Sequence, residues 1–492
     1  MSALTKDIIL TDEQEKCVEY DSGDLLVRGI AGSGKSVVLL ERAMNFNRKA
    51  IQERSNIKIG IFTYVNTLVK YTSDIANFSS LSDNMIEVHT MDSYCMKVCY
   101  NMTGQSQRVI YNNTRTECIA EALKKHKLRS GKNHRFYDAT TEFWGDEFKW
   151  IKEKYIKSSD EYINSDRSGR GSKIRMSNED KKIAWEIYMI YCDLIKSSGK
   201  IDWEDIYTYI IDNQEYIPND MKFDYVFVDE AQDLSLVKLK VAKLLSKNSI
   251  TIAADQAQKI YHTSFAWKDV GIDIRGRSSK SLKESFRSTK QVIMLADSLL
   301  EKNKGSLQKK GEYTEPILPK QEGPKPLIIC CENEKIQRES FIEQVKKAQK
   351  GKNNSVIGIF YRTSTEKETI MQWLDSEYLR YEEVKGKEGW SLLTPGIKLI
   401  TLHSAKGLEV DTVIIPKVEP DIIPISMEDY DKEEIEDALE MERSLLYVGM
   451  TRAKHALVLL YSQMPSQFIN EMKEEYYELE FAGEVTDDML PI

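Results

Sequence analysis

The segment Gly29-Ile30-Ala31-Gly32-Ser33-Gly34-Lys35-Ser36 constrains the fold of this chain more than any other feature. Residues 24–27 before it predict a short buried strand, and residues 37–44 after it predict a helix. Glycines at such a strand-to-helix turn let backbone N–H groups surround phosphate oxygens. The setting predicts a P-loop in an α/β domain, with Lys35 at the β- and γ-phosphates of a nucleotide and the Ser36 hydroxyl on Mg²⁺.

An acid pair, Asp229-Glu230, directly follows the apolar run 225–228. By itself an Asp-Glu pair is as often part of a solvated loop. Together with a P-loop it indicates a Walker B site, in which Asp229 holds the metal and Glu230 polarises the attacking water. Phosphoryl transfer is catalysed mainly by such positioning and charge stabilisation.

Composition limits the class of protein. The 492 residues are enough for several domains, and the net charge of −9 argues against a polycation that coats nucleic acid. Seven cysteines without a CxxC pair indicate reduced thiols in a cytoplasmic protein rather than a disulfide, zinc or iron–sulfur framework. We also expect no signal peptide and no membrane-spanning segment, because no apolar run approaches the required length of about 18 residues.

Apolar runs typical of buried parallel strands fall into two clusters, so we expect two α/β domains with parallel sheets. The runs are Ile57–Thr63, Tyr225–Val228, Ile250–Ala254, Val356–Tyr361, Ile397–Leu402, Thr412–Ile415 and Ala456–Leu460. Between them, residues 99–201 carry helical spacing and predict a mostly helical insertion in the first domain. The acidic segment 419–442 predicts a solvated loop and helix.

Part of the helical insertion is locally basic, with sixteen Lys or Arg against ten Asp or Glu over residues 124–182. Such a run is as often a solvated surface as a nucleic-acid track. The candidates for gripping a duplex or a partner are Lys149, Lys152, Lys154, Arg167 and Arg170.

The motifs of the first domain, in their order along the chain, resemble those of superfamily 1A DNA helicases of the UvrD, Rep and PcrA type. Leu10 to Gln14 is similar to the Q motif, in which Gln14 would bind adenine. The resemblance gives DNA-binding roles to Thr63 and Tyr64 of motif Ia and to His89 of motif Ib. In motif III, at residues 255–261, it makes Gln258 a γ-phosphate sensor and Tyr261 a base-stacking residue.

The second domain continues the resemblance. Phe286 and Arg287 would stack on adenine and bind the γ-phosphate, and Glu409 would bind the ribose. Arg452 of the segment 447–453 resembles an arginine finger. The roles toward DNA fall on Arg362, Thr401 and His403.

Two departures from the family pattern stand out. Thr263 occupies the position two residues after Tyr261 where relatives carry an aromatic, so Tyr261, Phe265 and Trp267 all remain candidates for base stacking, and Trp267 is equally suited to a core. Only 38 residues separate Arg362 from Thr401, where the family inserts its 2B domain. The resemblance therefore implies a compact form without 2B.

The resemblance implies RecA-like domain 1A at residues 1–98 and 202–285, insertion 1B at 99–201 and RecA-like domain 2A at 286–492. It implies ATP and Mg²⁺ as cofactors and 3′→5′ movement on single-stranded DNA, or on DNA with a 3′ tail. The alternative is a DNA-stimulated ATPase that serves a nuclease, a polymerase or a phage-defence complex. A P-loop kinase is disfavoured by the second set of nucleotide-contacting residues.

Overall fold

The structure is a computed structural model of all 492 residues. It describes residues 10–21, 23–63, 86–131, 133–165, 176–255, 267–272, 278–303, 305, 317–351, 355–384, 394–427, 435–484, 486 and 489–491. The chain divides into two compact units. The first comprises Met1–Val27, Ser36–Ala253 and His262–Lys280, and the second comprises Arg28–Lys35, Ala254–Tyr261 and Ser281–Ile492.

The first sheet has six strands in the order β3-β2-β4-β5-β1-β6. Their bounds are β1 Leu25–Gly29, β2 Ile59–Thr63, β3 Ile86–Thr90, β4 Phe223–Val228, β5 Ser246–Ala254 and β6 Ser279–Leu282. Strand β2 pairs in parallel with both β3 and β4, and β4 pairs in parallel with β5. The strands predicted at Ile57–Thr63, Tyr225–Val228 and Ile250–Ala254 are thereby confirmed.

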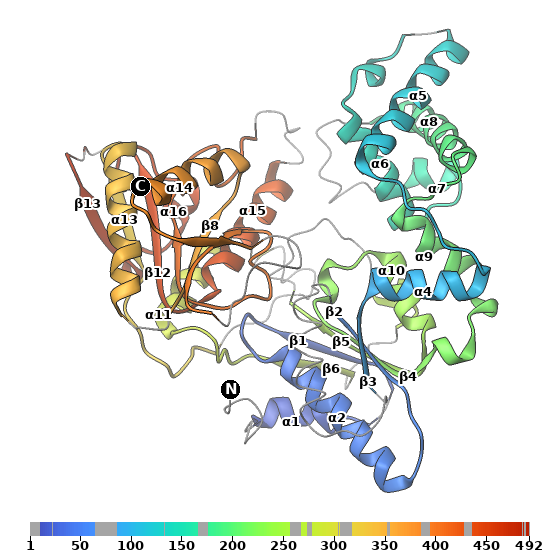
Figure 1. The fold of residues 1–492 in the computed structure, drawn as a ribbon, viewed down its shortest axis with the longest axis horizontal. Coiled ribbons are helices and arrows are strands. Elements are labelled where there is room, and N and C mark those ends of the chain that lie inside the picture. The colour runs from blue at the N-terminus through green and yellow to red at the C-terminus, as the bar shows by residue number, and fades with distance from the viewer. Residues whose placement is uncertain are drawn as a thin grey trace. The chain divides into compact units, whose positions relative to one another are not determined.

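Helices cover both faces of this sheet (Figure 1), which explains why its central strands are apolar throughout. Leu39, Leu40 and Ala43 of α2 (Lys35–Glu53) pack with Ile59 and Ile61 of β2. On the other face α4 (Met91–Thr103) brings the Tyr94 ring to 5.5 Å from that of Phe62. The remaining helices of this part include α1 (Asp12–Val18), α9 (Trp203–Asp212) and α10 (Leu236–Leu244).

The predicted helical insertion is present. It contains α5 (Asn112–Ser130), α6 (Thr141–Glu153), α7 (Ser159–Asn164) and α8 (Asn178–Ser197), drawn in teal to green in Figure 1. Its core is rich in aromatic side chains such as Trp144, Phe148 and Tyr191. The chain enters and leaves at adjacent points, because Val109 and Ile201 form a parallel bridge.

The second sheet has seven strands in the order β13-β7-β12-β11-β8-β10-β9, and all its pairs are parallel. Their bounds are β7 Leu327–Cys331, β8 Val356–Tyr361, β9 Tyr381–Glu383, β10 Gly396–Thr401, β11 Val410–Ile415, β12 Ala453–Ser462 and β13 Glu478–Ala482. The four predicted strands of the second domain are present as β8, β10, β11 and β12.

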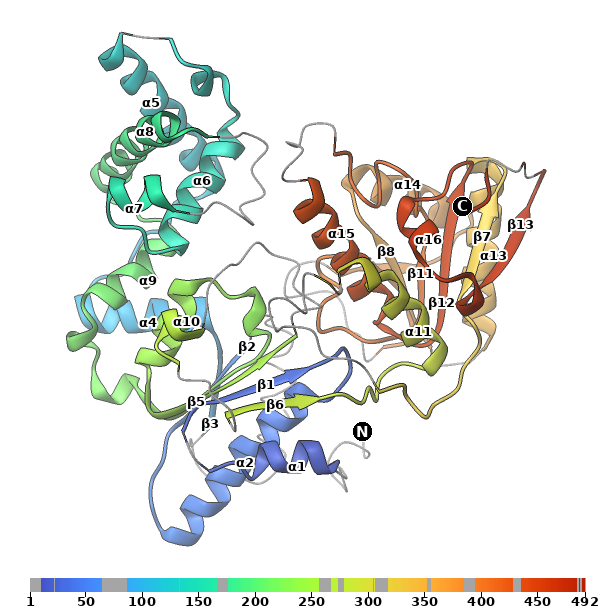
Figure 2. The ribbon, with the colours of Figure 1, turned by 180° about the vertical axis from the view of Figure 1, so that it is seen from behind.

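Two separate cores form on the two faces of the second sheet, and Figure 2 shows the helices that cover it. Helices α11 (Lys290–Leu299), α15 (Ile435–Met450) and α16 (Gln467–Glu471) pack on one face, and α13 (Glu334–Gly351) and α14 (Ser364–Ser376) pack on the other. Adjacent Cys330 and Cys331 belong to different cores, as neighbouring residues of a strand must. All seven cysteines are free.

Strand β8 leads to β10 through α14 and β9, and 38 residues separate Arg362 from Thr401. In the described part of the chain, no helix is both long and apolar enough to cross a membrane.

Candidate nucleotide and nucleic-acid site

The predicted P-loop connects β1, which ends at Gly29, to α2, which begins at Lys35. Gly32 and Gly34 have φ values of 71° and 78°, a left-handed region that favours glycine. At Gly29 a side chain is excluded for a different reason, since a Cβ atom would lie 2.9 Å from Cγ of Lys35. The glycine spacing of the motif therefore follows from the backbone path of the loop. Ile30, Ala31 and Ser33 complete the loop as buried residues.

The Lys35 ammonium is buried and held by three oxygens. Its Nζ donates to the carbonyl oxygens of Gly29 at 2.9 Å and Ile30 at 3.0 Å, and lies 3.3 Å from Oδ2 of Asp255. Sequence analysis gives Asp255 no role of its own. Its position in the sequence could have indicated a role, because Asp255 directly follows the apolar strand β5. The carboxyl edge of a parallel sheet is where ligands bind in such folds.

The Walker B carboxylate and the P-loop hydroxyl are in direct contact. Ser36 Oγ donates a short hydrogen bond to Oδ2 of Asp229, which is 3% exposed. The backbone N–H of Glu230 donates to the other oxygen, Oδ1, at 2.9 Å. Both oxygens of Asp229 are thus fixed by the residues predicted to flank the metal.

Glu230 has a left-handed backbone, with φ of 52°, which is uncommon outside glycine. Its side chain is oriented by Gln232, whose Nε2 donates to Oε2 of Glu230 at 2.6 Å. Sequence analysis missed Gln232, although it lies within the same acidic motif. A strained backbone and a fixed carboxylate are common features of functional sites.

A further group of predicted nucleotide residues lies within the second unit. The N–H of Phe286 donates to the carbonyl of Gly32 at 2.9 Å, and a Cβ atom on Gly32 would lie 2.6 Å from Cβ of Arg287. The Phe286 ring is 51% exposed and available for stacking. Glycine at position 32 therefore also permits the close approach of the segment that carries Phe286 and Arg287.

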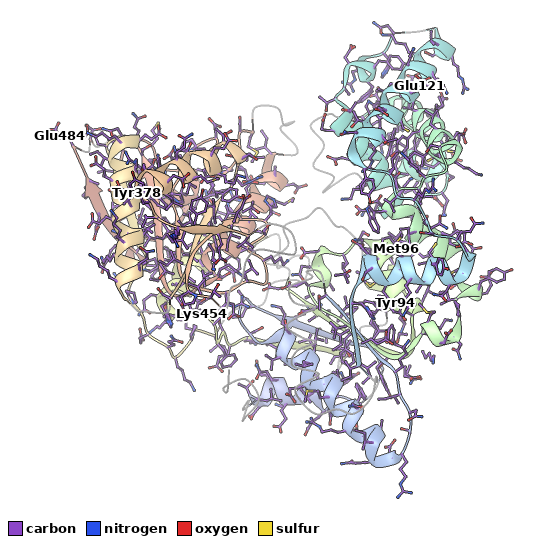
Figure 3. All side chains as sticks on the ribbon, viewed as in Figure 1. Tyr94, Met96, Glu121, Tyr378, Lys454 and Glu484 are labelled. Carbon is purple, nitrogen blue, oxygen red and sulfur yellow. The ribbon has the colours of Figure 1, made fainter. Side chains whose placement is uncertain are left out.

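Glu409 joins two cations. Its Oε1 lies 2.8 Å from Nε of Arg287 and its Oε2 lies 3.3 Å from Nζ of Lys454, which is labelled in Figure 3. Burial alone would raise the pKa of Glu409, but the charges of Arg287 and Lys454 outweigh it and lower this pKa. Lys454 is a residue that sequence analysis missed, although it lies two positions after Arg452.

Arg452 and Gln14 are both buried, and each forms hydrogen bonds with residues near it in the sequence. The Arg452 guanidinium donates to the carbonyl of Val448 at 2.9 Å and to Oγ1 of Thr451 at 3.2 Å. Gln14 caps its own helix, since its Oε1 accepts the N–H of Thr11 at 3.0 Å. Their predicted roles at the γ-phosphate and at adenine stay predictions.

Residues predicted to face DNA in the first domain lie at the carboxyl ends of two paired strands. Thr63 ends β2, and His89 lies one residue before the end of β3. The Nε2 atom of His89 is 2.8 Å from Oε2 of Glu87, and its ring is 4.8 Å from that of Tyr94, which Figure 3 labels. The sheet register thus brings motifs Ia and Ib together.

The corresponding residues of the second domain lie at the carboxyl ends of β8 and β10. Thr401 is paired in register with Tyr361, next to Arg362, and its Oγ1 accepts the N–H of Ser404 at 3.0 Å. Burial, followed by the charge of Arg362, lowers the pKa of His403, so this imidazole is neutral at pH 7.

Several predicted residues lie outside the described part of the chain. They are Tyr64, Gln258, Tyr261, Phe265, Arg167 and Arg170. Trp267 begins a short 3₁₀ turn, Trp267–Val270, but its side chain is also outside the described part.

Two expectations from the charge pattern are wrong. Lys152 does not face solvent as part of a basic surface: it is 4% exposed, and its Nζ lies 2.6 Å from Asp202 and 2.8 Å from Asp205. Glu442, at the end of the acidic segment, is not solvated either. It is buried and forms an ion pair with Arg362. In both cases a partner far away in sequence neutralises the charge and permits burial.

Comparison with known families agrees with the motif geometry. Residues 10–269 match the UvrD/REP helicase N-terminal domain. The chain belongs to the UvrD/REP helicase family. Residues 281–391 and 384–464 match the UvrD-like helicase C-terminal domain, so both RecA-like domains are accounted for.

Curated relatives of this family member are distant. A probable DNA helicase II homolog of Mycoplasma capricolum is 23% identical over 77% of this chain. The ATP-dependent DNA helicase PcrA of Staphylococcus epidermidis is 20% identical over the whole chain, and the putative ATP-dependent DNA helicase YjcD of Bacillus subtilis is 22% identical over 85% of it. The chain spans between 52% and 66% of the length of these relatives.

Proposed function

We propose that this UvrD/REP family chain hydrolyses ATP and uses the cycle to move 3′→5′ along single-stranded DNA, which makes it a DNA helicase of compact form. The observation that carries the proposal is the arrangement of Ser36, Asp229, Glu230 and Gln232 at the P-loop. It supplies a hydroxyl, a fixed carboxylate and an oriented second carboxylate, the groups that nucleotide hydrolysis needs.

In this proposal Lys35 exchanges its loop carbonyl partners for the β- and γ-phosphate oxygens of ATP. Its charge then stabilises the negative charge that develops on these oxygens. Glu230 accepts a hydrogen bond from the attacking water and orients it in line with the γ-phosphate. Gln232 fixes the direction of the Glu230 carboxylate, because its amide donates to one of the two oxygens.

The oxygen set at Ser36 and Asp229 fits Mg²⁺, which prefers hydroxyl, carboxylate and water oxygens. The two side chains already lie in contact, so Ser36 and Asp229 are the residues that would hold the cation. When bound, Mg²⁺ would supply positive charge that neutralises part of the phosphate charge.

Phe286 is proposed to stack on adenine, and Gln14 to form a hydrogen bond with the adenine edge. Arg287 and Arg452 are proposed to stabilise the γ-phosphate in the transition state, and Glu409 to bind the ribose. The ion pair of Arg287 with Glu409 supports this assignment, because it holds the guanidinium of Arg287 beside the P-loop glycine Gly32.

DNA-binding residues are proposed at the carboxyl ends of β2 and β3 in the first unit and, separately, at the carboxyl ends of β8 and β10 in the second. They would include Thr63, Tyr64, His89, Arg362, Thr401 and His403, with a stacking ring among Tyr261, Phe265 and Trp267. Stacking and backbone charge contacts together give binding that tolerates any sequence. The corresponding domain assignment is 1A at 1–98 and 202–285, 1B at 99–201 and 2A at 286–492.

A second candidate function is a DNA-stimulated ATPase that acts as an accessory subunit of a nuclease, a polymerase or a phage-defence complex. The short connection between Arg362 and Thr401 supports it, because the proposed compact form lacks the 2B domain that would regulate unwinding. The two functions share their ATPase and differ in what the chain does alone.

The test measures ATP hydrolysis with and without oligo(dT), followed by strand displacement on duplexes with either a 3′ or a 5′ tail. We expect stimulation by oligo(dT) and displacement of the 3′-tailed duplex only. Stimulation without displacement would favour the accessory ATPase, and hydrolysis indifferent to DNA would overturn both candidates.

A further inference from the structure

The Arg362 guanidinium is held by the carboxylate of Glu442. Nη2 lies 2.8 Å from Oε1, and Nε lies 3.3 Å and 3.2 Å from Oε1 and Oε2. The two side chains are only 16% and 9% exposed. A planar guanidinium bonded through two nitrogens to one carboxylate presents the geometry with which arginine also binds phosphate.

Glu442 belongs to the helix that leads to Arg452. It lies on α15, which ends at Met450, two residues before Arg452. Leu445, Leu446 and Val448 of the same helix are buried in the core of the second sheet, so α15 is a rigid element anchored along its length. A change at Glu442 therefore acts on the helix whose carboxyl end positions Arg452.

The positive charge of Arg362 is balanced by the carboxylate of Glu442. The nearby His403 is neutral at pH 7, because burial and then the Arg362 charge lower its pKa. Glu442 also accepts the backbone N–H of Ile425 at 3.4 Å, a weak bond that keeps it in place without neutralising it. A DNA phosphate that reaches Arg362 must compete with this carboxylate for the same donors.

We propose that Glu442 is a positioning residue that holds Arg362 in the DNA-free protein and yields it to a phosphate of single-stranded DNA. When the phosphate replaces Glu442, the Glu442 side chain is released. Strand binding at Arg362 is thereby coupled to α15 and to the position of Arg452. The inference rests on the proposed strand-dependent ATPase. Its consequence is that Glu442 lowers DNA affinity and suppresses hydrolysis when no strand is bound.

The decisive variant is Glu442→Gln, which keeps the size of the side chain and an acceptor oxygen for the Ile425 N–H. We expect fluorescence anisotropy to give about tenfold tighter binding of oligo(dT), equivalent to about 1.4 kcal/mol of binding free energy. ATP hydrolysis without DNA should rise as well. A purely structural ion pair would instead lower the melting temperature without raising affinity.

The matched control is Glu436→Gln. Glu436 lies on the same helix but is 71% exposed, and it is 3.8 Å from Arg443, so its neutralisation should change neither DNA affinity nor basal hydrolysis. Glu442→Asp provides a second variant if the glutamine variant does not fold. It keeps the charge but shortens the reach to Arg362, and should raise affinity by less than Glu442→Gln.

The double variant Arg362→Gln/Glu442→Gln separates this role from a general charge effect. Because Glu442 is proposed to affect DNA binding through Arg362, the double variant should bind oligo(dT) as weakly as Arg362→Gln alone. If Glu442→Gln or Glu442→Asp binds no tighter than the wild type, the inference fails while the proposed function stands. If the wild type neither binds oligo(dT) nor is stimulated by it, the proposed function fails instead.

Discussion

Nζ of Lys35 lies 3.3 Å from Oδ2 of Asp255, and both side chains are almost fully buried. The two residues are 220 positions apart in the chain. Before a nucleotide binds, Asp255 supplies the negative charge that the P-loop lysine requires in a buried position. The phosphates of ATP would supply that charge in its place. Asp255 and ATP would therefore each balance the positive charge of Lys35.

Replacing Asp255 should therefore destabilise the protein chiefly when no nucleotide is present. Asp255→Asn removes the carboxylate charge beside buried Lys35, and breaking a buried pair in this way costs about 3–5 kcal/mol. We expect a lower melting temperature than the wild type and a larger increase on adding ATP. The control is Asp21→Asn, whose ion pair with Lys49 is exposed and worth about 1 kcal/mol or less. If Asp255→Asn lowered the melting temperature equally with and without ATP, the phosphates would not replace the charge of Asp255.

Glu230→Gln should stop turnover while leaving ATP binding intact, because the amide can no longer accept the proton of the attacking water. A loss of about 10²–10⁴-fold in hydrolysis is typical of removing a general base. Gln232→Ala should give a smaller loss of the same kind, since it frees the carboxylate that Gln232 orients. Single-turnover hydrolysis and equilibrium binding of ATP measure the two effects separately. Near-normal hydrolysis by Glu230→Gln would refute its role as the base.

Phe286→Ala should raise the Michaelis constant for ATP, because the exposed ring is lost while the phosphate contacts remain. Aromatic stacking on a base contributes about 1–3 kcal/mol where it has been probed by alanine substitution. Phe286→Tyr retains the ring and serves as the control, with near-normal hydrolysis expected. An unchanged Michaelis constant in the alanine variant would place adenine elsewhere.

Sequence alone was sufficient for elements that depend on short-range patterns. The P-loop follows from the alternation of strand, glycine turn and helix around Gly32 and Gly34, and the strands buried on both faces follow from their unbroken apolar runs. The two edge strands of the second sheet, β9 and β13, were missed, and their residues are mostly exposed or half-buried. Strand β7 was missed as well, although it is apolar and largely buried. Edge strands bury too little to require a continuous apolar run.

The partners of buried charges could not be predicted in this way. Lys152 pairs with Asp202, 50 positions away, and Arg362 pairs with Glu442, 80 positions away. A charge pattern describes neighbours along the chain, whereas burial of a charge depends on a partner that only the tertiary fold brings near. For this reason the sequence placed both Lys152 and Glu442 on a solvated surface.

Glu366 on α14 should make the stability of the protein depend on pH. Burial raises the pKa of Glu366 from 4.5 to about 7, although the backbone N–H groups of Arg362 and Thr363 favour the charged form. Between these two values the folded protein holds a proton that the unfolded chain has released. The free energy of unfolding should therefore fall as pH rises through this window, by on the order of 3 kcal/mol. Below pH 4.5 both states are protonated and the penalty is absent.

Glu366→Gln should remove this dependence, because an amide stays neutral at every pH and its oxygen can still accept the N–H of Arg362. Urea unfolding at pH 5 and pH 8 measures the effect, and the variant should gain stability over the wild type at pH 8 but little at pH 5. Glu368→Gln, on the exposed side of the same helix, is the control and should leave the pH profile unchanged. If Glu366→Gln lost stability equally at both pH values, Glu366 would act as a helix cap whose charge does not matter.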